Sequence, residues 1–158
     1  MIAEKVLKEF ALFDGLDASK LTKIAEFCHE RTLNDGALCF SQGNQATELH
    51  LCRSGRVDIV VRIHEPWGTE VVVHTVKPGE VFGWSALAGP YLFTASAKCI
   101  GKVEEIYLKG VDLLKLFEKD PATGYIIMRN LGMLISSRLT ESREKLTRAI
   151  AASTNKEW

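Results

Sequence analysis

The chain has 158 residues, of which 46% are hydrophobic and 25% are charged. This length fits one domain, and the composition excludes disordered, collagen-like and disulfide-scaffold proteins. Twenty basic residues balance twenty acidic ones, so the chain has no overall positive charge to draw it onto nucleic acid or an anionic membrane. We therefore expect a single domain spanning residues 1–158.

The first ten residues carry four charged side chains, which interrupt the apolar segment that a secretory signal needs. The longest uncharged run, residues 81–97, contains glycine and proline and is shorter than a membrane span. We expect a cytoplasmic protein with no membrane contact. The cysteines at 28, 39, 52 and 99 form no CxxC pair and are interpreted as reduced core thiols.

In chain order, the spacing predicts N-terminal helices within residues 1–30, over 2–10 and 18–30, with Asp17 capping the second. Residues 31–109 contain alternating β-branched segments separated by turn signals, including Pro66-Trp67-Gly68 and Ser54-Gly55, which divides a strand around Leu51 from one around Val57. They predict an antiparallel roll, barrel or sandwich, in which Val57, Ile59 and Val61 share a core face. Helical spacing returns over residues 110–150, so the fold class is α+β.

The last helix carries two apolar stripes. Ile127, Leu131 and Leu134 form a short stripe, which we expect to pack on the chain's own β-domain. A longer seam has alternating spacings of four and three residues. It predicts a homodimer through this helix, although both stripes could also be buried within one chain. The seam consists of Met128, Gly132, Ile135, Leu139, Ser142, Leu146 and Ala149.

The segments LNDGALCFSQGNQATELHLCRSGRVDIVV and VKPGEVFGWSALAGPYLFTASAKC carry glycines at 36, 43, 55, 79 and 83. With the order helix, β-roll and long helix, they resemble the cyclic nucleotide-binding domain of the catabolite activator and fumarate-nitrate regulator families. The resemblance implies a jelly-roll-like β-roll over 31–109, with a phosphate-binding cassette over 82–99. A helix-turn-helix domain follows the long helix in those regulators. Since only eight residues follow here, we expect no direct DNA binding by this chain.

In the family, a glutamate after the cassette glycine holds the ribose, and an arginine nine or ten residues later pairs with the phosphate. This chain has Trp84 and Phe93 at those positions, followed by matching small residues at Thr94 and Ala95. Loss of the guanidinium removes a charge-assisted contact worth about 2 to 5 kcal/mol. The substitutions predict an apolar pocket for a planar or apolar ligand rather than cAMP or cGMP.

We accordingly expect a non-catalytic regulatory module that binds a small apolar or nucleotide-like ligand and acts on a downstream protein not identified by the sequence. The alternative is a ligand-free dimerisation or docking domain whose pocket is filled by Trp84 and Phe93. By the resemblance, Ser142 and Arg143 of the last helix complete the pocket. The candidate ligand residues are Gly83, Trp84, Ser85, Ala86, Phe93, Thr94, Ala95, Ser142 and Arg143.

Other chemistry has weaker support. No HxH or HExxH spacing occurs among the four histidines, so a cupin-type metal enzyme is a minor alternative. His74 could be a heme ligand, but a lone strand histidine is more often simply half-buried. Arg138, Arg143, Lys145 and Arg148 are offset by nearby glutamates and are interpreted as a solvated helix face.

Overall fold

A computed structural model describes residues 2–63 and 68–155. The predicted turn at Pro66-Trp67-Gly68 lies largely outside these residues. The helical segments are α1 (Glu4–Leu7), the 3₁₀ turn η1 (Ala11–Phe13), α2 (Ala18–Ala25), the 3₁₀ turn η2 (Trp84–Leu87), α3 (Gly110–Lys119) and α4 (Pro121–Thr154). The strands are β1 (His29–Leu33), β2 (Leu38–Phe40), β3 (Glu48–Arg62), β4 (Glu70–Val76), β5 (Val81–Phe82) and β6 (Ser96–Lys109).

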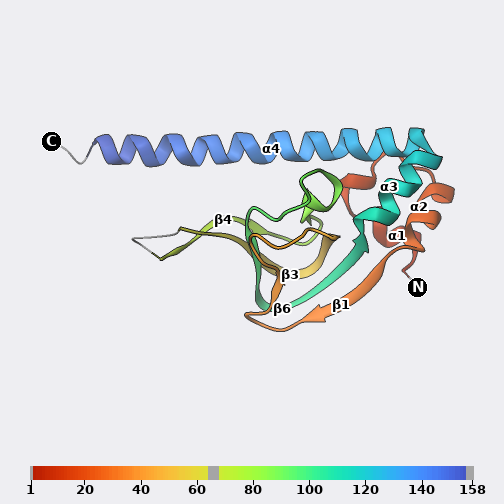
Figure 1. Cartoon of the computed structure of the whole chain (residues 1–158), viewed down its shortest axis with the longest axis horizontal. Helices are drawn as coiled ribbons and strands as arrows, with labels where there is room; N and C mark the ends of the chain where they lie inside the picture. The colour runs from red at the N-terminus through yellow and green to blue at the C-terminus, as the bar shows by residue number, and fades with distance from the viewer. Residues whose placement is uncertain (1, 64–67, 156–158) are drawn as a thin grey trace.

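The strands pair antiparallel in one curled sheet of order β1-β6-β3-β4, with β2 also pairing β6 and β5 also pairing β3. The N-terminal helices and α3 cover one end of this roll, while α4 runs along its side (Figure 1). The predicted α+β class, with an antiparallel β-roll and a long final helix, is confirmed.

Three elements differ from the sequence prediction. The helix expected over 2–10 is the short helix α1, which covers only Glu4–Leu7. The helix expected over 18–30 ends at Ala25, and the chain is already in β1 at His29. The segments around Leu51 and Val57, expected as separate strands, form the single strand β3, whose register shifts near Ser54. Gly55 permits this irregularity because its φ is +84° and a Cβ there would overlap the backbone of Lys102.

The core is divided between the two ends of the roll. The larger cluster lies where α1, α2, α3 and the first part of α4 meet the near ends of β3 and β6. The smaller cluster, which includes Val57, Phe82 and Cys99, fills the roll itself. As predicted, the short stripe of α4 faces the chain's own domain: Ile127 and Leu131 are buried, and Leu134 packs against the same core.

Polar contacts fix the first half of α4. The buried side chain of Asn130 donates hydrogen bonds to the carbonyls of Leu12, at 2.9 Å, and Asp14, at 2.8 Å. At the helix start, Asp120 accepts from the backbone N–H and hydroxyl of Thr123 and forms a 2.6 Å ion pair with Lys20 of α2. These contacts satisfy the helix N-terminus and tie α4 to the N-terminal segment.

All four cysteines are free thiols. Burial raises the pKa of Cys28 to about 12 and, with smaller contributions from nearby carboxylates, that of Cys52 to about 11. Neither thiol is activated as a nucleophile, because nucleophilic attack requires the thiolate. Within residues 2–63 and 68–155 there is no group of three or more metal-ligating side chains. In the same ranges, no helix has the length and apolar character to cross a membrane.

Candidate ligand pocket

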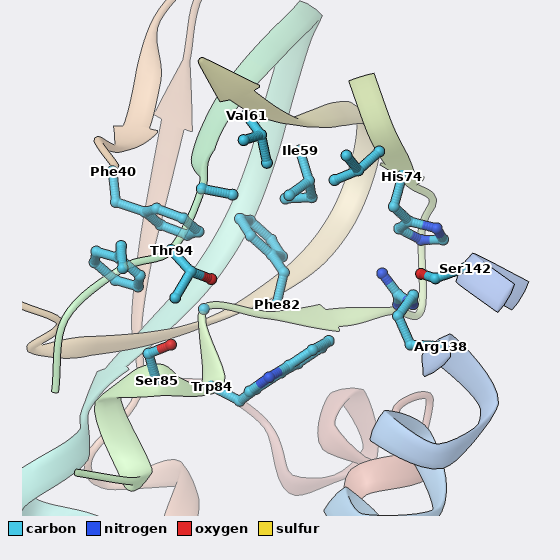
Figure 2. Close-up of a pocket in the computed structure, with 14 residues that line it drawn as sticks. Phe40, Ile59, Val61, His74, Phe82, Trp84, Ser85, Thr94, Arg138 and Ser142 are labelled. Carbon is cyan, nitrogen blue, oxygen red and sulfur yellow. The ribbon is translucent and has the colours of Figure 1, made fainter. Parts of the chain in front are cut away.

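A cavity of about 220 Å³ lies between the open side of the roll, the 82–99 segment and α4. Strands β3 and β4 supply one wall, η2 with the loop after it supplies another, and two side chains of α4 close the side (Figure 2). The lining residues are Phe40, Ile59, Val61, Val73, His74, Phe82, Gly83, Trp84, Ser85, Phe93, Thr94, Ala95, Arg138 and Ser142.

Two glycines place the cassette against its neighbours. Gly83, immediately before η2, has a φ of +74°, and a Cβ there would lie 2.8 Å from His50 Cδ2. Only glycine fits both constraints without strain. At the other end of η2, the carbonyl oxygen of Ala86 occupies the space where a side chain at Gly110 would begin. The short helix therefore sits directly on the start of α3.

The cassette side of the cavity is aromatic. Phe93 is only 6% exposed and stacks on Phe40 of β2, with ring centroids 3.8 Å apart and planes 9° apart. Phe93 also packs with Ala46 and Ala86 in a small cluster. Phe40 is in turn 6.0 Å from the buried ring of Phe82. Phe93 is thus a packed core residue at the position where the resemblance expects a cation.

Trp84 lies at the opposite side of the cavity floor and is only partly buried. The guanidinium of Arg138, on α4, is 5.4 Å from the centre of its ring, within the range of a cation–π contact. Arg138 Nη2 donates to Glu80 Oε1 at 3.2 Å. Burial lowers the pKa of Arg138, and Glu80 and Glu141 oppose that shift, but an arginine remains protonated at any ordinary pH.

His74 of β4 joins the same cluster. Its Nε2 lies 3.1 Å from Glu80 Oε1, and its Nδ1 lies 3.3 Å from Glu141 Oε2 without the geometry of a hydrogen bond. Lys145, one turn beyond Glu141, approaches Glu141 at 3.6 Å and donates to the carbonyl of Val73 at 3.2 Å. A cluster of ionisable side chains from β4, the β4–β5 turn and α4 therefore joins the helix to the mouth of the cavity.

A second ionic cluster supports the aromatic floor from behind. His50 lies between Phe40 and Phe82, with ring centroids 5.3 and 5.1 Å away, and its Nδ1 is 3.1 Å from the buried carboxylate of Glu105. Burial raises the pKa of Glu105, but His50 and Arg31 together outweigh it and hold that pKa below its usual range. Glu105 therefore stays ionised and fixes His50 in place.

The structure brings together seven of the nine residues predicted to contact a ligand. Ala86 is buried beside Phe93 instead of lining the cavity, and Arg143 is exposed and lies outside it. The cation at the cavity is Arg138, which the sequence assigned to a solvated face. Its position was detectable, because Arg138 and the predicted Ser142 are four residues apart and so share one helix face. The lining residues from the prediction are Gly83, Trp84, Ser85, Phe93, Thr94, Ala95 and Ser142.

Comparison with known proteins gives consistent results. Residues 30–120 match the family model of the cyclic nucleotide-binding domain. Glutaminase 1 of Bradyrhizobium diazoefficiens is 31% identical over 144 residues, which are 89% of this chain and 22% of the glutaminase. The chain spans less than a third of the length of the curated relatives it matches.

Two solved structures have the same fold. The catabolite activator protein of Thermus thermophilus is 29% identical, with a TM-score of 0.71, covering 88% of this chain and 62% of that one. A cyclic nucleotide-binding domain from Methylobacillus flagellatus is 17% identical, with a TM-score of 0.82, covering 93% and 85%.

Proposed function

This chain belongs to the cyclic nucleotide-binding domain family, and from that premise we propose that it is a non-catalytic sensor whose pocket takes a small ligand other than cAMP or cGMP. Family membership makes it a regulatory domain, and the proposal concerns what it senses. The Phe93–Phe40 stack carries the argument. A buried ring at the phosphate position offers no charge to a cyclic phosphate, so binding loses its strongest contact.

The open part of the cavity supports ligand binding over a permanently filled pocket. Phe93 is packed, but Trp84 is only partly buried, and a volume of about 220 Å³ remains beside it. That space exceeds the engineered cavity of about 150 Å³ that binds benzene. The Phe93 packing itself favours the second candidate, a ligand-free dimerisation or docking domain.

A homodimer through α4 is part of this proposal. The seam on α4 is exposed in the single chain, with exposed fractions of 49% at Leu139 and 61% at Leu146. Met128 and Ile135, further towards the start of the helix, are also exposed. A seam in which four of the seven residues are large, apolar and exposed is typical of a helix that packs on a second copy. Ser142 belongs to the seam and also lines the cavity, so the two sites meet.

Calorimetry with cAMP and cGMP tests the ligand assignment. We expect no dissociation constant at or below a few micromolar, about −7 to −8 kcal/mol, for either nucleotide. Tighter binding of either one would contradict the proposal.

A thermal-shift screen of small molecules separates the sensor from the docking domain. For the sensor we expect compounds that raise the Tm of the wild type and leave that of Val61→Trp unchanged, because the larger side chain fills the cavity from β3. A screen without such compounds would favour the ligand-free docking domain.

A further inference from the structure

The ionisable side chains that line the cavity lie at one end of it. The end formed by β2 and the cassette presents Phe40, Phe93 and the hydroxyls of Ser85 and Thr94. The end formed by β4 and α4 presents His74 and Arg138, as Figure 2 shows. Among the lining residues only Arg138 carries a permanent charge, so the cavity has an uncharged, largely aromatic end and an end that presents one cation.

Arg138 has hydrogen-bonding capacity left for a ligand. Of its five N–H donors, one on Nη2 is used by Glu80, and Nε lies 4.0 Å from Glu141, too far for a hydrogen bond. Its Nη1 makes no hydrogen bond to any residue that the structure describes. The side chain is 20% exposed and borders the cavity, so its remaining donors are available to a group placed there.

The carboxylates of Glu80 and Glu141 would keep other partners if Arg138 bound a ligand instead of them. Glu80 also accepts from the backbone N–H of Lys77, at 2.6 Å, and lies against His74. Glu141 keeps its ion pair with Lys145. An anion that takes over the guanidinium therefore leaves neither carboxylate as an isolated buried charge, which would otherwise oppose binding.

The size and charge of the site restrict what fits. A cavity of about 220 Å³ is below the range of about 300 to 1,000 Å³ that holds drug-sized ligands. It suits one ring with a short side group. A single guanidinium already shared with Glu80 matches one carboxylate better than a doubly charged phosphate, and it binds a carboxylate through two parallel hydrogen bonds.

We propose that the pocket binds a small aromatic carboxylate, with its ring against Trp84 and the Phe40–Phe93 pair and its carboxylate on Arg138. This inference rests on the proposed function, because it requires the cavity to be a ligand site. The anion then lies at the α4 end, opposite to the cassette end where the resemblance places a phosphate.

The test is calorimetry with probes that separate charge from ring. Phenylacetate carries both, phenylacetamide lacks the charge, and acetate lacks the ring. We expect phenylacetate to bind at least about tenfold more tightly than either of the others. In Arg138→Gln the preference for phenylacetate over its amide should disappear, and in Arg138→Lys it should be reduced, since lysine keeps the charge without the planar fork.

Arg148→Gln is the matched control, because Arg148 is on the same helix but outside the cavity, and it should keep the full preference. Circular dichroism establishes that each variant is folded. Equal binding of phenylacetate and phenylacetamide would overturn this inference and leave the proposed function standing. Micromolar binding of cAMP would overturn the proposed function itself. If no aromatic probe binds, this inference also fails.

Discussion

Trp84 and Phe93 occupy two positions that the resemblance assigns to charged ligand contacts, but the two side chains have different structural roles. Phe93 is buried in a stack with Phe40 and is part of the domain's packing. Trp84 is partly buried, contacts the guanidinium of Arg138 and leaves open space beside it. A change at position 93 therefore acts first on stability, whereas a change at position 84 acts first on the pocket.

Restoring both charges should restore nucleotide binding. In the variant Trp84→Glu with Phe93→Arg, we expect millimolar cAMP to raise the Tm, because a carboxylate and a guanidinium again face the ligand. Phe93→Arg alone should lose the stack and bury an unpaired charge, costing about 3 to 5 kcal/mol. Trp84→Glu alone should be milder, since the residue is only partly buried. A double variant that folds without any cAMP-dependent shift contradicts this interpretation of the cassette.

Among the helices and strands, the sequence predicted most of the strands of the roll but not how two of its segments join into one strand. Alternation and glycine spacing identified the strands, because both follow from local backbone geometry. The fusion of two segments into β3 depends on pairing with β6, which is tertiary information. Arg138 was misassigned for a different reason: its charge was weighed only against the nearby glutamates, although its spacing of four residues from Ser142 places both on one face of α4.

The N-terminal cap of α4 makes the folding stability of the domain depend on pH in the acid range. Hydrogen bonds from Lys20 and Thr123 hold the pKa of Asp120 well below its usual range. A lowered folded-state pKa adds stability above the unfolded value, about 3.9, and that stability is lost as the pH falls through the folded-state pKa. Asp120→Asn keeps a capping side chain but loses the charge. The wild type should therefore have a higher urea midpoint than Asp120→Asn at pH 7. The difference between the two midpoints should decrease below about pH 4.

Asp112→Asn, on α3, serves as the control for this measurement. Asp112 is in the first turn of its helix and forms no ion pair with the described residues. The urea midpoint of Asp112→Asn should differ only slightly from that of the wild type at every pH. A gap between wild type and Asp120→Asn that stays constant from pH 7 to pH 3 would show that the Asp120 charge contributes nothing.

At the scale of the whole molecule, α4 connects the pocket with the surface proposed for dimerisation. Its first half is buried on the core through Ile127 and Leu131. Its second half touches the roll through Arg138, Glu141 and Lys145, and the seam lies exposed beside them. If a ligand that changes the partners of Arg138 also shifts the seam, pocket occupancy and dimer affinity are coupled, and the coupling acts equally in both directions.

Leu139→Lys places a charge in the middle of the seam and should dissociate the dimer while the roll stays folded. Sedimentation velocity at micromolar concentration measures the first effect, and circular dichroism measures the second. Ser137→Lys, which adds the same charge two residues away and off the seam, should remain dimeric. A wild type that sediments as a monomer at this concentration would refute the dimer.

The hydrogen bonds of Asn130 to Leu12 and Asp14 have a mechanical consequence. Together with the buried Ile127 and Leu131 they hold the first half of α4 on the core, whereas from Ile135 to Ile150 all residues except Arg138 and Glu141 are exposed. At 1.5 Å per residue, Arg138 lies about 12 Å beyond Asn130 along the helix, and Thr154 lies about 36 Å beyond it. If the helix turns about Asn130 as a rigid rod, its far end therefore moves about three times as far as Arg138. A displacement of about 1 Å at Arg138 becomes about 3 Å at the far end, which is enough to misalign two packed helices.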